Sequence, residues 1–476
     1  MGRPMDAKAG SLLHTLLQFL MQLRQQQPAC SKLTIGFSGG MDSYVLLYAI
    51  HQTLQQVTAN AEKYPALQGF KLSALHINHG LSPRADAWQT HCEAICLKLN
   101  VSFLAQDVVI HRKTGESLEE LARQARYRVF ADKLQPDECL LMAHHQDDQA
   151  ETLLLRLMRG AGPRGLAAMP LSRPLGKGLL WRPFLEIPRA FLHDYANVHH
   201  LQWIHDESNL DVRFDRNFVR HELFPLIAKR WPGYRQSWQR SSQLSAEADQ
   251  LNQELAVIDY QLVMAESKQQ LDCTGLLTLS SARQRNVIRY WLSLLAFPDP
   301  GWQVLRRCSE EVLSAAIDTK PELIWAGHEL RRFQKRIYAL RTMPLLDMTQ
   351  TLMVTLENLS CGKNIELPDN GFLVFSAAHS TAENQLLKLP DMGSLVISYR
   401  KGGEICRLSG RRSRPLKKIL HDAGIPPWLR DRLPLLYSEN QIAFIPGVGP
   451  CDGFASSAGS TGVLPEWLPS IDSPLS

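Results

Sequence analysis

Apolar residues along the first 200 positions fall into short runs that alternate with longer stretches of helical spacing. The runs expected to form strands are Leu33–Phe37, Leu72–Asn78, Ser102–Gln106, Cys139–Ala143 and Leu179–Pro183. The stretches expected to form helices are Ser43–Gln55, Asp86–Leu99, Ser117–Leu134, Asp147–Arg159 and Pro188–His199. This alternation is typical of the α/β class, because each helix returns the chain to begin the next parallel strand. The pattern therefore predicts a doubly wound parallel sheet.

The pattern changes after about residue 217. Helical spacing dominates from Trp238 to about Arg341, residues 343–390 are irregular with short β-like pieces, and the remainder alternates strand, basic helix and strand. We therefore expect the α/β domain to be followed by a mainly α-helical domain and a small α+β C-terminal domain. The expected boundaries are 1–222, 223–342, 343–390 for an irregular linker, and 391–476, with a loose tail after Gly459.

Composition indicates a globular enzyme of more than one domain. The chain has 476 residues, of which 45% are hydrophobic and 21% are charged. It shows no apolar run long enough to span a bilayer and no secretory signal at its start, so we expect a cytoplasmic protein without a membrane partner. Its nine cysteines form no Cys-x-x-Cys pair, which predicts reduced and mostly buried thiols.

Positive charge is concentrated near the C-terminus. The whole chain carries a net charge of +5, whereas residues 400–432 contain ten Lys and Arg against three acids, a balance of 10 − 3 = +7. Such a dense run predicts contact with an RNA backbone, although a solvated helix face is the alternative. The candidate RNA-binding residues are Arg411, Arg412, Arg414, Lys417, Lys418 and Arg430.

The segment Ser38-Gly39-Gly40-Met41-Asp42-Ser43 joins the first expected strand to the first expected helix. Glycines at such a turn let the backbone approach an anion, and the N–H groups at the start of the helix point towards it. The two serines add hydroxyl donors, and Asp42 can hold a magnesium ion that bridges phosphates. A simple helix cap is the alternative interpretation. We favour phosphate binding, and the turn lacks the Gly-Lys-Ser/Thr of a Walker loop.

Polar residues also follow two other expected strands. His76–Gly80 comes after the second strand, and His144–Asp148 comes after the fourth. The carboxyl ends of parallel strands lie at one edge of a sheet, where such folds bind ligands. The sequence therefore predicts one cleft that contains the Ser38–Ser43 turn, His76 and His144.

Further candidates surround this cleft. We expect Asp148 and Glu151 to project from one face of the first turn of a helix, where they could act on a substrate. The alternative is that they lie there only because the helix dipole stabilises carboxylates near a helix N-terminus. Arg126 is either a surface ion-pair residue or a donor that offsets charge as pyrophosphate leaves. Two other segments could bind substrate or only cap and pin the fold. They are the glycine-rich loop with Arg159 and Arg164, and the acidic stretch with Asp206 and Asn209 that leads to Arg216 and Arg220.

The Ser38–Ser43 turn resembles the loop of the PP-loop ATP pyrophosphatases, which split ATP between its α and β phosphates. Further motifs, in order and spacing, resemble the tRNA(Ile)-lysidine synthetase family within this superfamily. They are His-x-Asn-His-Gly-Leu at 76–81, Ala-Arg-x-x-Arg-Tyr at 122–127, His-His-x-Asp-Asp-Gln-x-Glu-Thr at 144–152, Arg-Gly-x-Gly at 159–162, Asp-Glu-Ser-Asn with Arg-Asn at 206–217, and the segment 416–431.

The resemblance implies a ligase that modifies the wobble cytidine of a tRNA(Ile) with a CAU anticodon. ATP adenylates the C2 oxygen of the base with loss of pyrophosphate, and free L-lysine then displaces AMP to give lysidine. The change converts codon specificity from AUG to AUA and amino-acid identity from methionine to isoleucine. Residues 1–222 would be the PP-loop catalytic domain, and 223–342 and 391–476 would bind tRNA. The chain would act as a monomer or a homodimer.

The same resemblance assigns roles to the cleft residues. Asp42 would hold Mg²⁺, and His144 or Arg126 would offset charge in the adenylation step. Asp148 and Glu151 would grip or deprotonate the lysine, while other substrate contacts would come from Arg159, Arg164, Asp206 and Asn209. The residues expected to bind ATP are Ser38, Gly39, Gly40, Met41, Asp42, Ser43 and His76.

Two other functions compete with this one. A tRNA thiolase built on the same loop would need a reactive cysteine or a cysteine cluster near the cleft, which the absence of Cys-x-x-Cys disfavours. A non-catalytic RNA-binding protein would not need Asp42, His144 and Glu151 together.

Overall fold

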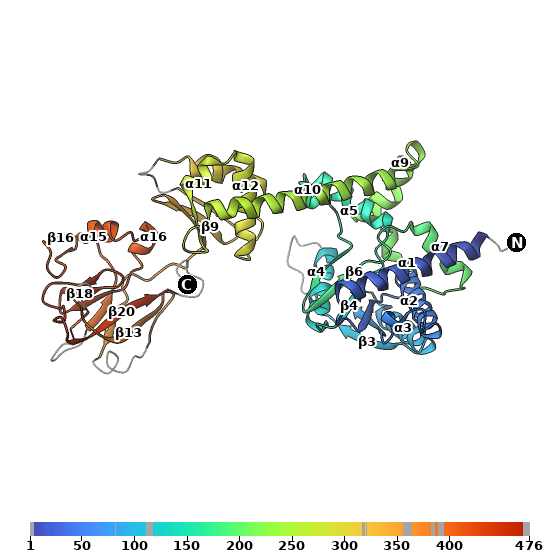
Figure 1. Cartoon of the computed structure of the whole chain (residues 1–476), viewed down its shortest axis with the longest axis horizontal. Helices are drawn as coiled ribbons and strands as arrows, with labels where there is room; N and C mark the ends of the chain where they lie inside the picture. The colour runs from blue at the N-terminus through green and yellow to red at the C-terminus, as the bar shows by residue number, and fades with distance from the viewer. Residues whose placement is uncertain are drawn as a thin grey trace. The chain divides into compact units, whose positions relative to one another are not determined.

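The computed structural model describes residues 4–80, 82–110, 118–316, 319, 321–355, 364–381, 386–388 and 395–469, with side chains except at 4–11, 118, 119, 208 and 209. The chain divides into two compact units, Met1–Leu251 and Asn252–Ser476, which Figure 1 colours from blue to green and from green to red. Among the described residues, no helix is both long enough and apolar enough to span a membrane.

The first unit is built on a six-stranded sheet with the order β3-β2-β1-β4-β6-β5. β1, β2, β3, β4 and β6 are parallel, which confirms the predicted fold class, and β5 pairs antiparallel with β6. The strands are β1 (Lys32–Gly36), β2 (Lys71–Asn78), β3 (Ser102–Asp107), β4 (Glu138–Leu141), β5 (Ser172–Leu175) and β6 (Gly178–Trp181). The turns that follow β1, β2 and β4 therefore lie at one edge of the sheet.

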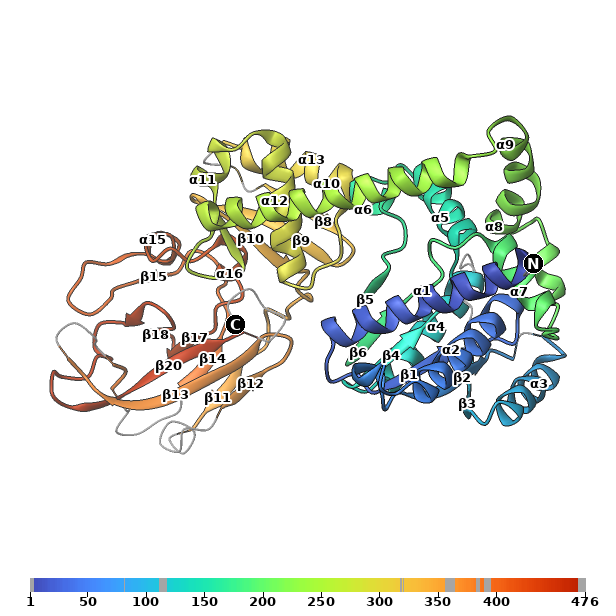
Figure 2. The same ribbon diagram turned by 45° about the vertical axis from the view of Figure 1, so that its right-hand side comes forward.

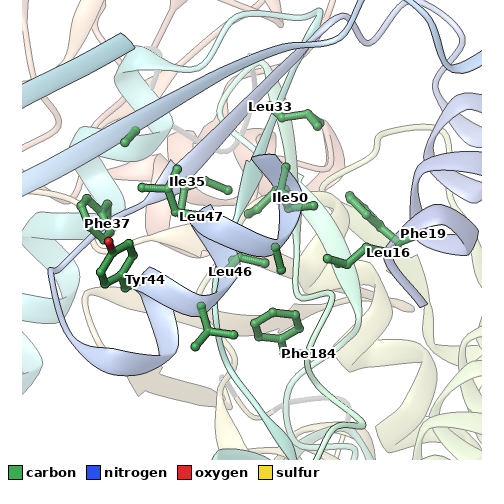
Figure 3. Close-up of a cluster of buried hydrophobic side chains, with 14 of the residues drawn as sticks. Leu16, Phe19, Leu33, Ile35, Phe37, Tyr44, Leu46, Leu47, Ile50 and Phe184 are labelled. Atoms are coloured by element: carbon green, nitrogen blue, oxygen red, sulfur yellow. The ribbon is translucent and has the colours of Figure 1, made fainter. Parts of the chain in front are cut away.

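Helices pack on both faces of this sheet. On one face, α1 (Pro4–Gln26), α2 (Met41–Ala59), α3 (Ala85–Lys98) and α7 (Arg189–Val198) bury leucine, isoleucine and aromatic side chains against the strands. Figure 3 shows part of this core, in which Leu46, Leu47 and Ile50 of α2 lie near Ile35 of β1. On the other face, Phe130 of α4 (Leu118–Lys133) packs with residues of β2, β4 and β6. Ser117, expected to begin this helix, lies outside the described residues.

The first unit continues through several short helices beyond the sheet. Their bounds are α5 (Gln146–Met158), α6 (Pro163–Leu166), η2 (Glu207–Leu210), α8 (Asp215–Phe218), η3 (Val219–Leu223) and α9 (Phe224–Arg230), and η1 (Pro65–Leu67) precedes β2. The long helix α10 (Tyr234–Val263) begins in the first unit and ends in the second. A small cluster of Ala150, Val219, Phe224 and Tyr234 joins α5 to this region. The segment after α7 is thus packed against α5, next to the predicted cleft.

The second unit begins with helices and a small antiparallel sheet. The helices are α11 (Cys273–Thr278), α12 (Ser281–Leu294), α13 (Gly301–Arg307) and η4 (Cys308–Leu313). The sheet has the order β7-β10-β9-β8, with β7 (Gln270–Asp272), β8 (Glu322–Trp325), β9 (His328–Phe333) and β10 (Arg336–Arg341). The helical spacing noted up to Arg341 therefore ends earlier than expected, because three of these strands occupy residues 322–341.

The rest of the second unit is mostly antiparallel sheet, seen from a second side in Figure 2. One sheet has the order β11-β14-β17-β18-β19, another β12-β13-β20, and β15 pairs with β16. The elements are β11 (Leu352–Val354), β12 (Ile365–Leu367), β13 (Gly371–His379), β14 (Leu395–Ser398), β15 (Ile405–Cys406), β16 (Arg414–Pro415), α15 (Leu416–Asp422), α16 (Pro427–Arg430), β17 (Leu435–Ser438), β18 (Gln441–Ile445), β19 (Gly449–Pro450) and β20 (Thr461–Leu468).

The expected loose tail after Gly459 is wrong for the residues that the structure describes. β20 pairs with β13 over eight residues, and Val463 lies in the core of this sheet. Pro465 is opposite Phe375 in that ladder. The prolines of this segment led to the expectation of a loose tail. A strand at the edge of a sheet tolerates proline, however, because its outward N–H is not needed for pairing. Residues 470–476 lie outside the described part of the chain.

Candidate active site

The turn between β1 and α2 is held in shape by its own serines. The Ser43 hydroxyl donates to the carbonyl of Gly40 at 3.0 Å and lies 3.1 Å from the Ser38 hydroxyl. The backbone N–H of Ser38 donates to the same Ser43 oxygen at 3.3 Å. Gly40 is the N-cap of α2 and receives no side-chain cap, so the first N–H groups of the helix are available to an anion.

Gly39 is required by two features of this turn. Its backbone has a φ of 78°, in the left-handed region that favours glycine. A Cβ atom at this position would lie 2.5 Å from Cδ1 of Ile204 and 2.8 Å from the sulfur of Cys92. The carbonyl of Gly39 also accepts a hydrogen bond from the N–H of Ile204 at 3.0 Å. The turn is therefore fixed on one side by the chain that follows α7.

A cavity of about 990 Å³ opens beside this turn. It is lined by residues from the ends of β1, β2 and β4, from α4 and from the segment 204–220. The predicted site residues that it brings together are Ser38, Gly40, Asp42, Ser43, His76, Arg126, His144 and Asp206. Met41 instead points into the core. The other predicted residues with described side chains do not line the cavity, namely Gly39, Asp148, Glu151, Arg159 and Arg164; the side chain of Asn209 lies outside the described part.

Three histidines that line the cavity, His76, His79 and His144, have lowered pKa values and are neutral near pH 7. Burial lowers the pKa of His76, whose Nδ1 lies 2.9 Å from the carbonyl of Phe37. Burial, together with Arg126 and His76, lowers the pKa of His79 to about 4. Burial also holds the pKa of His144 well below its ordinary value, helped by nearby arginines. Arg182 donates to Nδ1 of His144 at 3.3 Å, so the neutral ring carries its proton on Nε2.

His145 has the opposite character. Burial alone would lower its pKa, but Asp148, Asp42 and Asp147 outweigh this effect and raise the pKa above its ordinary value. Its Nε2 lies 3.7 Å from Asp42 and 3.4 Å from Asp148. Its Nδ1 accepts from the N–H of Asp148, whose carboxylate accepts from the N–H of His145. This reciprocal cap fixes the start of α5 next to Asp42.

Two carboxylates of α5, Asp148 in its first turn and Glu151 in its second, are paired with arginines from α8 and η3. Arg216 donates to Glu151 at 2.6 Å and to Asp148 at 3.0 Å. Arg220 donates to Glu151 at 2.7 Å and to Asp148 at 3.1 Å. Glu151 is fully buried, and His145 with both arginines holds the pKa of Asp148 well below its ordinary value despite its burial. We call these four side chains the Arg–carboxylate cluster.

This cluster bears on one expectation from the sequence, that Asp148 and Glu151 bind lysine. Asp148 and Glu151 were expected to face the ammonium group of lysine, but in this structure their oxygens accept from guanidinium groups. Arg216 and Arg220 of the segment that closes the domain therefore pin α5 by salt bridges, whereas Asp206 of the same segment lines the cavity. Arg216 and Arg220 line the cavity and Asp148 and Glu151 do not, so the cluster presents positively charged groups to the cavity.

Asp42 has the environment of a cation ligand. Its Oδ1 is buried and has no hydrogen-bond partner among the described residues, although the side chain lines the cavity. Its Oδ2 lies 3.7 Å from both His145 and Arg189. The described residues contain no group of three or more histidine, cysteine or acidic side chains that could hold a metal alone. One carboxylate with phosphate oxygens is a common way to bind Mg²⁺, so these residues fit such an ion.

Comparison with known proteins agrees with this geometry. Residues 13–227 match the family model of the PP-loop domain, residues 271–338 the TilS substrate binding domain, and residues 395–467 the TilS substrate C-terminal domain. The tRNA(Ile)-lysidine synthase of Coxiella burnetii is 37% identical over 92% of this chain and 93% of its own. The enzymes of the same name from Serratia proteamaculans and Pseudomonas aeruginosa are 39% and 40% identical over 93% and 91% of this chain, and 96% and 93% of theirs.

The chain belongs to the tRNA(Ile)-lysidine synthase family. It is thus an ATP-dependent ligase that modifies tRNA by forming lysidine, with the PP-loop domain as its ATP-binding part. Among the described residues, no cysteine lines the cavity, which disfavours the competing thiolase interpretation. The sulfur of Cys92 lies next to the PP-loop turn, but burial raises the pKa of this thiol to about 12.

The basic segment near the C-terminus is largely exposed. We use this name for Arg411, Arg412, Arg414, Lys417 and Lys418, all of which are exposed, with Arg414 also 2.7 Å from Asp422. Arg430 does not share this surface. It is 8% exposed, donates to the carbonyl of Ile425 at 2.8 Å and lies over the ring of Phe333. Its expected contact with RNA is therefore replaced by a packing role.

Sequence reasoning missed three residues of the lysidine synthase site. Arg182 follows β6, donates to His144 and to the carbonyl of Pro170, and is 2% exposed. Arg189 begins α7 and faces Asp42. Phe214 lines the cavity although it lies in a stretch dominated by charged residues. No local sequence motif marks any of the three.

Proposed function

We propose that the chain attaches L-lysine to C2 of the wobble cytidine in a tRNA(Ile) with a CAU anticodon. In the first step the C2 oxygen of the base attacks the α-phosphorus of ATP, and pyrophosphate leaves. In the second step the ε-amino group of lysine attacks C2, loses a proton, and AMP leaves. The observation that carries this proposal is the single cavity shared by the PP-loop turn, His144 and the arginines of the segment 204–220.

The triphosphate of ATP would bind at the PP-loop turn. The uncapped N–H groups at the start of α2 and the hydroxyls of Ser38 and Ser43 supply donors for phosphate oxygens. His76 lines the same end of the cavity. Mg²⁺ held by Asp42 would supply charge neutralisation to the phosphates when bound. Gly39 and Met41 would support the turn and not contact ATP with their side chains. The carbonyl of Gly39 is bound to Ile204, and Met41 lies in the core.

Charge that develops during adenylation would be offset by arginines rather than by His144. A buried imidazole with a lowered pKa is neutral at pH 7, so it offers one N–H donor and no charge. Arg126, Arg216 and Arg220 line the cavity and keep their charge at all physiological pH values. Fixed guanidinium donors aimed at a site with little water stabilise the phosphoryl oxygens most when negative charge accumulates there.

Two sets of carboxylates are candidates for binding the ammonium group of lysine. Asp206 lines the cavity, whereas Asp148 and Glu151 do so only through their arginine partners. We propose that Asp206 meets the incoming lysine first, and that Asp148 and Glu151 accept its ammonium only if Arg216 or Arg220 moves onto a phosphate. Replacement of Asp206 by Asn would then raise the KM for lysine and leave the KM for ATP unchanged.

The RNA would be held outside the cavity by the basic segment, with Arg159 and Arg164 close to the catalytic unit. The side chain of Arg159 is 73% exposed at the end of α5, where it is available to a phosphate. The direct test is to incubate the full chain with ATP, lysine and tRNA(Ile), and to determine the mass of the anticodon nucleosides. Lysidine at the wobble position is expected, and a methionine tRNA with the same anticodon is the control. Release of pyrophosphate without incorporation of lysine would contradict the proposal.

A further inference from the structure

Phe214 is an aromatic side chain in an otherwise highly polar part of the cavity wall. It precedes α8 in an extended conformation, with φ −84° and ψ 127°, and its side chain is 36% exposed. The cavity residues that follow it in sequence are Arg216, Asn217 and Arg220. A phenylalanine placed between water and guanidinium groups gains little from burial, so packing alone gives a weak reason for its position.

The residues that follow Phe214 contact α5 through their side chains. Arg216 is bound to the first turn of α5, where His145 faces Asp42. The carboxylate of Asp215 lies 4.0 Å from the long side chain of Arg159, which follows the last turn of the same helix. Phe214 therefore precedes a segment whose side chains reach both the proposed phosphate end of the cavity and the exposed Arg159.

The outer end of α5 has the character of a surface that binds RNA. Leu157 and Met158 are 56% and 78% exposed, and Arg159 follows them directly. Exposed apolar side chains next to arginines are typical of sites for single-stranded nucleic acid, where rings stack on bases and cations meet phosphates.

We infer that Phe214 is the stacking surface for the nucleobase that enters the cavity from the RNA, an inference that rests on the proposed function. A base that leaves its stack in the anticodon loop loses the contacts of its two faces. A partly exposed ring at the cavity wall restores one of them without reading the sequence of the RNA. The aromatic ring would stack on the base, and the neighbouring arginines would bind the phosphate.

The adenine of ATP is the other flat ring that could use this surface. The two sources are distinguished by their Michaelis constants in the full chain. For Phe214→Ala we expect the KM for tRNA to rise roughly 5- to 150-fold, the range given by loss of one base–aromatic stack, with the KM for ATP changed less than twofold. Phe214→Trp is expected to restore the KM for tRNA, because it retains an aromatic face.

Phe218→Ala is the matched control, since Phe218 is equally apolar and more exposed but does not line the cavity. It is expected to leave both constants unchanged. A second measurement uses a tRNA with the fluorescent base pyrrolocytosine at the wobble position. Its emission on binding should be quenched by the unmodified chain and by Phe214→Trp, and should remain high with Phe214→Ala.

Three results would overturn the inference. They are a rise in the KM for ATP instead of tRNA, equal effects of Phe214→Ala and Phe218→Ala, and identical quenching by all variants. Failure of the unmodified chain to form lysidine would instead contradict the proposed function. Circular dichroism and thermal melting of each variant show whether a loss of affinity comes from loss of the fold.

Discussion

Replacing Gly39 by alanine tests whether the PP-loop turn has the close contacts described above. The new methyl group would lie 2.5 Å from Ile204 and 2.8 Å from Cys92, and it would sit on a backbone with a φ of 78°. A left-handed backbone costs an L-residue about 1–2 kcal/mol, and overpacking costs about 1–3 kcal/mol more. The free energy of unfolding of the first unit should therefore fall by about 2–5 kcal/mol.

Thermal melting is the assay. At about 2–4 °C per kcal/mol for a unit of this size, the transition of Gly39→Ala should fall by roughly 4–20 °C. ATP binding, measured by titration calorimetry at a temperature below the transition, should weaken as well, because the turn must shift to admit the methyl group. Gly40→Ala is the matched control for stability, since a Cβ at Gly40 would meet only the Ser38 hydroxyl, at 3.4 Å.

A second substitution separates steric overlap from backbone strain. Ile204→Val removes the Cδ1 atom that lies nearest to the added methyl group. The double variant Gly39→Ala/Ile204→Val should be more stable than the sum of the two single effects predicts, which a double-mutant cycle measures. A Gly39→Ala chain that melts and binds ATP like the unmodified chain would refute the reasoning.

Four further predictions concern charge. Asp42→Ala should abolish turnover while the Kd for tRNA stays within twofold; normal lysidine formation would exclude its role as a magnesium ligand. Glu151→Ala removes a fully buried acceptor from two half-buried guanidinium groups and should lower the free energy of unfolding by about 3 kcal/mol in urea titrations. The exposed ion pair between Arg84 and Glu207 should contribute less than about 1 kcal/mol. The pKa of Asp148 is lowered in the folded chain, so its stabilisation is complete above its ordinary pKa and is lost as pH falls through and below that value. Asp148→Asn should therefore show a shallower loss of stability between about pH 5 and pH 3, and an unchanged slope would contradict this. Alanine at Arg411, Arg412 and Arg414 together should weaken tRNA binding and reduce its dependence on salt; equal affinity at moderate salt would remove the basic segment from the interface.

The sheet of the first unit was predictable because its strands carry continuous apolar runs between helical stretches. Leu33–Phe37 and Cys139–Ala143 correspond to β1 and β4 to within a few residues. The strand β5 was not predicted, since its Arg and Pro give it no apolar pattern, and it is defined only by its antiparallel partner β6. The sheet in residues 322–341 was missed for a similar reason: alternating charges in β9 obscure its buried face.

The candidate site was also predictable only in part. The Ser38–Ser43 turn, His76 and His144 were placed in one cleft because the ends of parallel strands must meet at one edge. The partners of Asp148 and Glu151 were not predictable, because Arg216 and Arg220 are more than 60 residues away in sequence. Burial of Arg430 was equally hidden, since a count of charges along the chain cannot show which guanidinium lies over a ring.

The Arg–carboxylate cluster has a consequence for how the enzyme is made. While a nascent chain is still short of residue 216, α5 carries two acids whose partners have not been synthesised, and burying them unpaired costs several kcal/mol. The first turn of α5 can therefore dock only after the segment with both arginines has left the ribosome. A polypeptide that ends before residue 216 would hold the strands and the glycine turn but would lack the two arginines that complete the cavity wall.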